Sequence, residues 1–106
     1  MKNYRDLAIR IHKISRQLPK FELFEEGSQI RRSSKSTTSM IVEGYGRRRY
    51  KAEFIRYLIF SQSECDETIV HLDFLFETES LKDKILYSDL RSEYDLLSKR
   101  INKFIQ

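Results

Sequence analysis

The sequence predicts an all-α protein, an antiparallel up-down-up-down four-helix bundle that forms one domain over residues 1–106. Its 106 residues include only three glycines and one proline, and residues that interrupt helices are needed wherever a chain turns often. Apolar residues also recur at intervals of three and four along four segments, which places them on one face of each helix. Short connections between such helices favour antiparallel neighbours.

The first two predicted helices differ in the size of their apolar side chains. Pro19 ends the first helix, because a residue before proline is pushed out of the helical region. The second carries Ile30 and Ile41 but mostly Gly, Ser and Thr on its inner face, and Gly44 and Gly46 are expected to end it. The apolar face of the first helix contains Tyr4, Leu7, Ile11, Ile14 and Leu18.

The third helix is predicted from about Arg49 to near Thr78 and is the most apolar. A helix that is apolar on most sides needs cover on most sides, so we expect self-association through it. A polar loop with a short helical turn is expected from Glu77 to Ser88, where Ser88 would cap the last helix. Outside its main stripe the third helix carries Ile55, Ile59, Phe60, Val70, Phe74 and Leu75. The last helix has Leu90, Tyr94, Leu97, Ile101 and Phe104 on one face.

The cysteine count and the hydropathy pattern indicate a cytoplasmic protein. The single cysteine, Cys65, cannot form an internal disulfide, which favours a reducing compartment. No apolar run approaches the roughly 18 residues of a spanning helix, and the charged N-terminus has no apolar segment behind it. We therefore expect neither a membrane association nor a signal peptide.

Positive charge is concentrated in one part of the chain. The net charge is +4, yet residues 28–56 hold eight basic and only two acidic residues. Arginine and lysine in such a cluster suit phosphate groups, and three interleaved tyrosines could stack on unpaired bases. The alternative is that these charges form ion pairs or a solvated surface. The candidate nucleic-acid-binding residues are Arg31, Arg32, Lys35, Arg47, Arg48, Arg49 and Lys51, and the tyrosines are Tyr45, Tyr50 and Tyr57.

No motif predicts catalysis, a cofactor or a metal. The glycines of EGYG lack the longer glycine pattern and the Lys-Ser/Thr pair of phosphate-binding loops. Cys65 lies on a buried stripe, so it is expected to act as a small core residue. His71 shares a helix face with Glu64 and Glu67, but the Glu-x-x-His spacing of di-metal bundles is absent, which makes these three surface residues. His12 has no neighbours typical of a ligand set. We therefore expect a protein that is not an enzyme.

The second helix and the turn beyond it resemble a known family. Residues 28–58, SQIRRSSKSTTSMIVEGYGRRRYKAEFIRYL, are similar to the bacterial four-helix bundle proteins first known from intervening sequences of large-subunit ribosomal RNA genes. The matching positions are Ser28, Gln29, Ile30, Arg31, Arg32, Val42, Glu43, Gly44, Tyr45, Gly46 and Arg47. The family pattern Ser-Ile-Pro-x-Asn is replaced here by residues 36–40, so its proline and asparagine are missing.

The resemblance implies a ring-like homo-oligomer, with a pentamer favoured, and no enzymatic activity. Related bundle proteins bind nucleic acid. Together with the basic cluster, this leads to the hypothesis of a homo-oligomer that binds RNA or DNA. The alternative hypothesis is a structural or adaptor module, in which the apolar third helix builds the oligomer and another protein is the partner.

Overall fold

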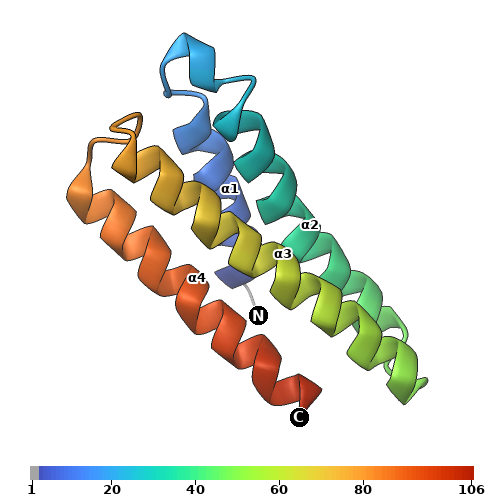
Figure 1. The fold of residues 1–106 in the computed structure, drawn as a ribbon. Helices are drawn as coiled ribbons and strands as arrows, with labels where there is room; N and C mark the ends of the chain where they lie inside the picture. The colour runs from blue at the N-terminus through green and yellow to red at the C-terminus, as the bar shows by residue number, and fades with distance from the viewer. Residues whose placement is uncertain (1–2) are drawn as a thin grey trace.

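The chain folds into four α-helices, and no strand occurs within residues 3–106, which the computed structural model describes. Figure 1 shows the α1–α2 and α3–α4 connections at one end and the α2–α3 connection at the other, so that consecutive helices run in opposite directions. The prediction of an all-helical four-helix fold is confirmed. The elements are α1 (Asn3–Ser15), the short 3-10 helix η1 (Lys20–Glu22), α2 (Glu26–Gly46), α3 (Lys51–Glu77) and α4 (Lys84–Ile105).

The core lies between the apolar faces that the spacing predicted. Helix α3 packs most extensively on α2 and next on α4, whereas α1 contacts α4 only sparsely. The largest buried side chains include Ile11, Ile30, Leu72, Leu75, Leu90, Tyr94, Leu97 and Ile101.

Between residues 3 and 106 no helix combines the length and the apolar character needed to cross a membrane.

The α2–α3 interface is made of small polar side chains. Ser33 and Thr68 share a hydrogen bond between their hydroxyl oxygens at 2.8 Å, and the Ser61 hydroxyl donates to the backbone oxygen of Thr37 at 2.9 Å. These buried hydroxyls of the α2–α3 interface therefore have the partners that burial requires. This pairing is the reason why α2 can use serine and threonine where a bundle helix usually carries leucine.

Gly44 has a different role from the predicted one. It lies inside α2, which continues to Gly46, and no glycine in residues 3–106 has a positive φ. A Cβ atom on Gly44 would lie 3.1 Å from the Cβ of Tyr57 on α3. The prediction that Gly44 ends the helix is wrong, because the residue instead allows α2 and α3 to approach closely.

Helix α4 starts earlier than predicted. Asp83 caps it by accepting a hydrogen bond from the Leu86 amide at 3.0 Å, and Ser88 lies within the helix, so the Ser88 cap was a wrong prediction. The polar loop covers only residues 78–83. The predicted inner face of α4 is buried except for Phe104, which is 59% exposed.

Helix α3 leaves apolar side chains uncovered by the other three helices. Of the six apolar residues predicted outside its main stripe, Leu75 is buried and Ile55 is half-buried. The remaining four are between 44% and 49% exposed: Ile59, Phe60, Val70 and Phe74.

Candidate nucleic-acid interface

Arg31 joins α2 to the preceding part of the chain. Its Nη1 donates to the Ser15 hydroxyl at 3.0 Å, and its Nη2 donates to the backbone oxygen of Leu23 at 2.6 Å. Two of the donors of this predicted phosphate ligand are therefore engaged within the fold.

Arg32 faces α3 and its carboxylates. Its guanidinium forms ion pairs with Glu67 and, at 3.5 Å, with Glu64. Next to them the His71 ring pairs with Glu26. Only 14% of the His71 side chain is exposed, so His71 is less accessible than the surface position predicted for it. No three His, Cys, Asp or Glu side chains within residues 3–106 are grouped so that they could hold a metal ion. The Arg32 charge is thus compensated by neighbouring acids.

The other arginines of the predicted set gather where α2 ends and α3 begins. Arg48, Arg49 and Lys51 are exposed, and no ion pair within the described residues involves any of the three. Arg47 lies 3.5 Å from Glu43, one helical turn back. We call the four residues Arg47, Arg48, Arg49 and Lys51 the basic corner.

Tyrosines surround the basic corner. The Arg48 guanidinium lies 4.1 Å from the ring centre of Tyr45, and that of Arg47 lies 4.7 Å from the ring centre of Tyr57. Tyr45 and Tyr50 are 60% and 66% exposed. Stacked guanidinium groups keep their outward donors, so the corner presents cationic and aromatic surfaces together.

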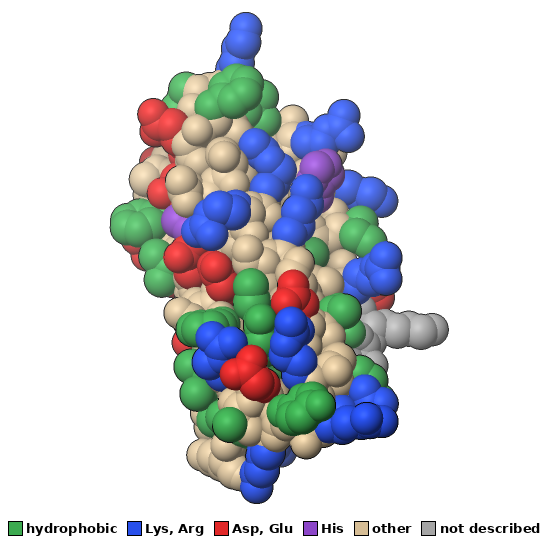
Figure 2. Space-filling view, turned by 90° about the vertical axis from the view of Figure 1, so that its right-hand side faces the viewer, with side chains coloured by type: hydrophobic (Ala, Val, Ile, Leu, Met, Phe, Trp, Pro, Cys, Tyr) green, Lys and Arg blue, Asp and Glu red, His purple; other side chains and the backbone are tan. Residues whose placement is uncertain are grey.

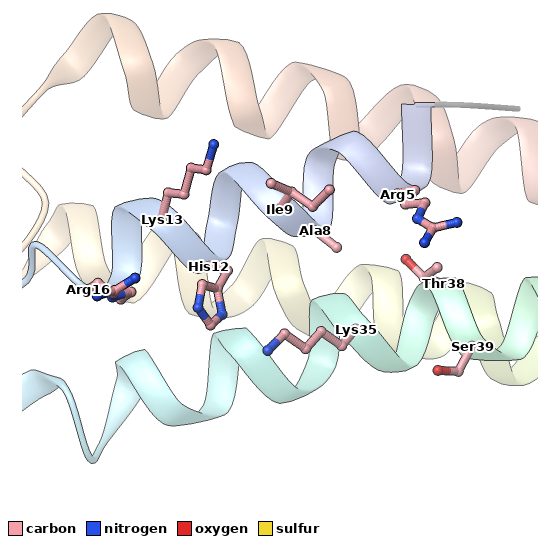
Figure 3. A pocket seen from close by; sticks show the side chains of 9 residues that line it. All are labelled: Arg5, Ala8, Ile9, His12, Lys13, Arg16, Lys35, Thr38 and Ser39. Atoms are coloured by element: carbon pink, nitrogen blue, oxygen red, sulfur yellow. The ribbon is translucent and has the colours of Figure 1, made fainter.

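A groove between α1 and α2 collects a second set of basic residues. It has a volume of about 470 Å³, and Figure 3 shows His12 reaching from α1 toward α2, with Lys35 beneath it on α2 and Arg5 and Arg16 on either side along α1. Figure 2 shows Lys and Arg side chains grouped around a histidine on one face of the molecule. We call the set that lines the hollow the α1–α2 groove: Arg5, Ala8, Ile9, His12, Lys13, Arg16, Lys35, Thr38 and Ser39.

The positive charges around this groove affect the pKa of His12. The pKa of His12 is below its ordinary value, chiefly because of the Lys35 charge and further because of partial desolvation, Arg16 and Arg31. The His12 Nδ1 is buried and has no hydrogen-bond partner among the described residues. Within residues 3–106 no carboxylate lines the groove itself, so the charges of Lys35, Arg16 and Arg31 act on His12 without an acidic residue in the lining.

The structure thus separates the predicted residues. Lys35 belongs to the α1–α2 groove, the basic corner keeps four members together, and Arg31 and Arg32 precede Lys35 on α2, away from the corner, with partners inside the fold. Sequence reasoning missed Arg5, His12 and Arg16. Their spacing of seven and then four residues places them on one face of a helix, which was the available signal.

The Cys65 thiol is not placed to act as a nucleophile. Cys65 is fully buried, and its thiol donates to the Tyr94 backbone oxygen at 3.3 Å. Burial raises the pKa of Cys65 to about 12, so the thiol stays protonated at neutral pH. The prediction that it acts as a core residue is confirmed.

These features define the class: a small all-helical protein with basic surfaces and uncovered apolar residues on its central helix. Residues 1–103 match the sequence model of the 23S rRNA-intervening sequence protein family, and the chain belongs to that family. It is also similar to a solved protein of unknown function from the S23 ribosomal protein family of Bacteroides thetaiotaomicron, with 24% identity, 99% of this chain and 96% of that chain covered, and a TM-score of 0.87. No curated protein matches the chain. Neither similarity indicates an enzymatic activity.

Proposed function

We propose that the protein is a non-enzymatic, cytoplasmic nucleic-acid-binding protein that contacts RNA or DNA phosphates through the basic corner. The observation that carries this proposal is the presence of three adjacent exposed cations, Arg48, Arg49 and Lys51, without acidic partners among the described residues. Such charges bind phosphates by releasing counterions from the nucleic acid.

The tyrosines of the corner add a second mode of contact. Tyr50 is 66% exposed, and an exposed ring offers a stacking face to an unpaired base, an interaction worth about 1–3 kcal/mol per base. Arginine on tyrosine, as at Arg48 and Tyr45, holds the guanidinium in place without neutralising it. This combination favours nucleic acid with unpaired bases, such as the loop of a structured RNA.

The proposal includes assembly into a homo-oligomer, with the pentamer implied by the family resemblance. The uncovered apolar side chains on α3, among them Phe60 and Phe74, support such an assembly, because a helix that is apolar on most sides needs cover on most sides. Repetition of the basic corner by symmetry strengthens binding without any new contact type. Solution mass measured by light scattering tests this part: a monomeric mass would contradict it.

Paired substitutions test the role of the corner. Arg48→Gln with Arg49→Gln removes two exposed charges there, whereas Lys82→Gln with Lys84→Gln removes two exposed charges at the opposite end of the bundle. We expect the corner pair to weaken binding of a hairpin RNA at least about tenfold at about 50 mM salt, and the control pair to have little effect. Equal affinities for the two variants would contradict the proposal.

A second candidate function is an adaptor that binds another protein. An apolar hollow of about 510 Å³ at the end of the bundle favours it. Under this alternative, charge reversal of Arg47 and Arg49, which do not line the hollow as Arg48 does, leaves the biological activity intact. The residues lining the hollow are Tyr4, Ile41, Val42, Tyr45, Arg48, Phe54, Leu58, Ile101 and Phe104.

A further inference from the structure

The α1–α2 groove has the features of a ligand site separate from the basic corner. We infer that it binds the phosphodiester backbone of a single nucleic-acid strand, with Arg5, Arg16 and Lys35 on phosphates and His12 joining them by taking up a proton when the strand binds. This inference rests on the proposed nucleic-acid binding, but it involves residues that do not belong to the basic corner.

The lining of the groove suits phosphate oxygens. Arg5 on α1 and Arg16, the residue that follows this helix, are eleven residues apart, a distance of about 16 Å along the helix axis, and Lys35 faces them from α2. Near Arg5, Ser39 adds a hydroxyl group, whereas the Thr38 hydroxyl already donates to the Tyr4 backbone oxygen at 3.3 Å. Cations distributed over this length match a chain of several phosphates better than a single small anion.

The groove continues toward the basic corner. A neighbouring hollow of about 380 Å³ shares Arg5, Thr38 and Ser39 with it and ends at Val42 and Glu43 on α2. Glu43, at the end of this hollow, forms an ion pair of 3.5 Å with Arg47 of the basic corner. A strand that follows α2 could therefore contact both basic surfaces in succession.

The dimensions favour one strand over a duplex. The seam between two packed helices, whose axes are about 8–10 Å apart, is too narrow to receive the width of a double helix. A duplex also keeps its bases paired and its two backbones on the outside, so that it would touch the seam only with one edge. A flexible single strand can lie along the groove and place successive phosphates near Arg5, His12 and Arg16.

His12 gives the groove a response to pH. In the free protein, Lys35 from α2, partial desolvation, Arg16 just after α1 and Arg31 from α2 hold the pKa of His12 below its ordinary value, and Lys13 of α1 also lines the groove. From α4, the other helix packed on α1, the charged contact is the ion pair of Asp89 with Arg10 at 2.6 Å, and neither residue lines the groove.

A bound phosphate reverses this balance. Its negative charge favours the protonated imidazole, which raises the pKa of His12 in the complex relative to the free protein. The complex therefore binds one more proton than the separate partners at pH values between the free and the bound pKa. Affinity is consequently expected to rise as pH falls through that interval, by at most about tenfold per pH unit.

The experiment compares four variants with the wild type. The probe is an unstructured oligouridine with 5′-hydroxyl ends, so that no terminal phosphate titrates. The groove pair is Lys35→Gln with Arg16→Gln, and the corner pair is Arg48→Gln with Arg49→Gln. All four residues are exposed. We expect the groove pair to weaken binding about tenfold and to reduce the slope of log affinity against log salt by about 1.4, since each lost phosphate contact on a single strand changes it by about 0.7.

The third variant, His12→Gln, tests the proton. Wild-type protein should bind the oligouridine several-fold more tightly at about pH 6 than at about pH 8, and His12→Gln should lose this difference. His71→Gln is the matched control, because it removes the other histidine, which lies on α3 beside Glu26, and should keep the pH dependence.

The outcomes separate this inference from the proposed function. The groove site alone is overturned if the corner pair loses affinity while the groove pair keeps the wild-type affinity and salt slope and His12→Gln keeps the wild-type pH dependence. A wild-type protein that binds neither oligouridine nor hairpin RNA at about 50 mM salt overturns both proposals. Displacement of the strand from the groove by inorganic phosphate at equal ionic strength, or equal binding of a duplex, also overturns the single-strand assignment.

Discussion

The Arg31 guanidinium on α2 donates a hydrogen bond of 3.0 Å to the hydroxyl of Ser15, the last residue of α1. The same side chain donates to the Leu23 backbone oxygen at 2.6 Å, so it links α1, the connection after η1, and α2. Arg31→Gln should lower the free energy of unfolding by about 1–3 kcal/mol, because both acceptors lose a charged donor. Urea unfolding followed by circular dichroism measures this change.

Arg32 is the matched control for that substitution. It is one residue further along α2, its side chain is 53% exposed, and its ion-pair partners Glu64 and Glu67 are 24% and 40% exposed. Arg32→Gln should therefore cost no more than about 1 kcal/mol. If both variants were equally destabilised, the assigned role of Arg31 in joining the elements would be wrong.

Gly27 allows the close approach of the connection to the start of α2. A Cβ at this position would lie 2.6 Å from the backbone oxygen of Glu22, so the backbone must move to admit it. Gly27→Ala should destabilise the protein by about 1–3 kcal/mol. Gly46, whose Cβ would have no atom within 4 Å, is the control: Gly46→Ala should stabilise by about 0.4–1 kcal/mol. The two variants thus change the unfolding midpoint in opposite directions, and a rise for Gly27→Ala would refute the close approach.

Substitutions at Asp83 and Ser88 test which residue caps the N-terminus of α4. Asp83→Ala removes the acceptor of the Leu86 amide and should cost about 0.5–2 kcal/mol, whereas Asp83→Ser should restore most of the loss. Ser88→Ala, inside the helix, should have a much smaller effect. Thermal unfolding of the three variants distinguishes the observed cap from the one the sequence suggested.

Alkaline pH should destabilise the fold through Cys65. Its pKa is raised from 9.0 in its ordinary state to about 12 in the folded protein, so the folded state keeps a proton that the unfolded state releases. Stability is therefore full below about pH 9 and falls above it, by at most about 1.4 kcal/mol per pH unit. Cys65→Ala should flatten this slope between about pH 9 and pH 10, and an unchanged slope would exclude the thiol as its source.

Much of the fold was predictable because it depends on local periodicity. The spacing of Leu90, Tyr94, Leu97 and Ile101 fixes the inner face of α4, and all four are buried. The cap was not predictable in the same way, since Asp83 and Ser88 are both suitable residues and the choice depends on how the loop packs Leu81 into the core.

The candidate site was predictable only where its residues are consecutive. The basic corner follows from RRRYK, because neighbours in sequence stay neighbours at a turn. The α1–α2 groove brings Lys35 to His12 and Arg16 across 19 or more residues of chain, and that proximity depends on the rotation of α1 against α2. The hydrogen bonds of Arg31 likewise depend on the path of the connection, which no spacing rule specifies.

The most direct test of the central claim is the affinity of the wild-type protein for a hairpin RNA with an unpaired loop, measured over a salt series. We predict binding at about 50 mM salt that weakens linearly in log affinity against log salt, as phosphate contacts by exposed cations require. No binding at about 50 mM salt, or an affinity that does not change with salt, would contradict the account.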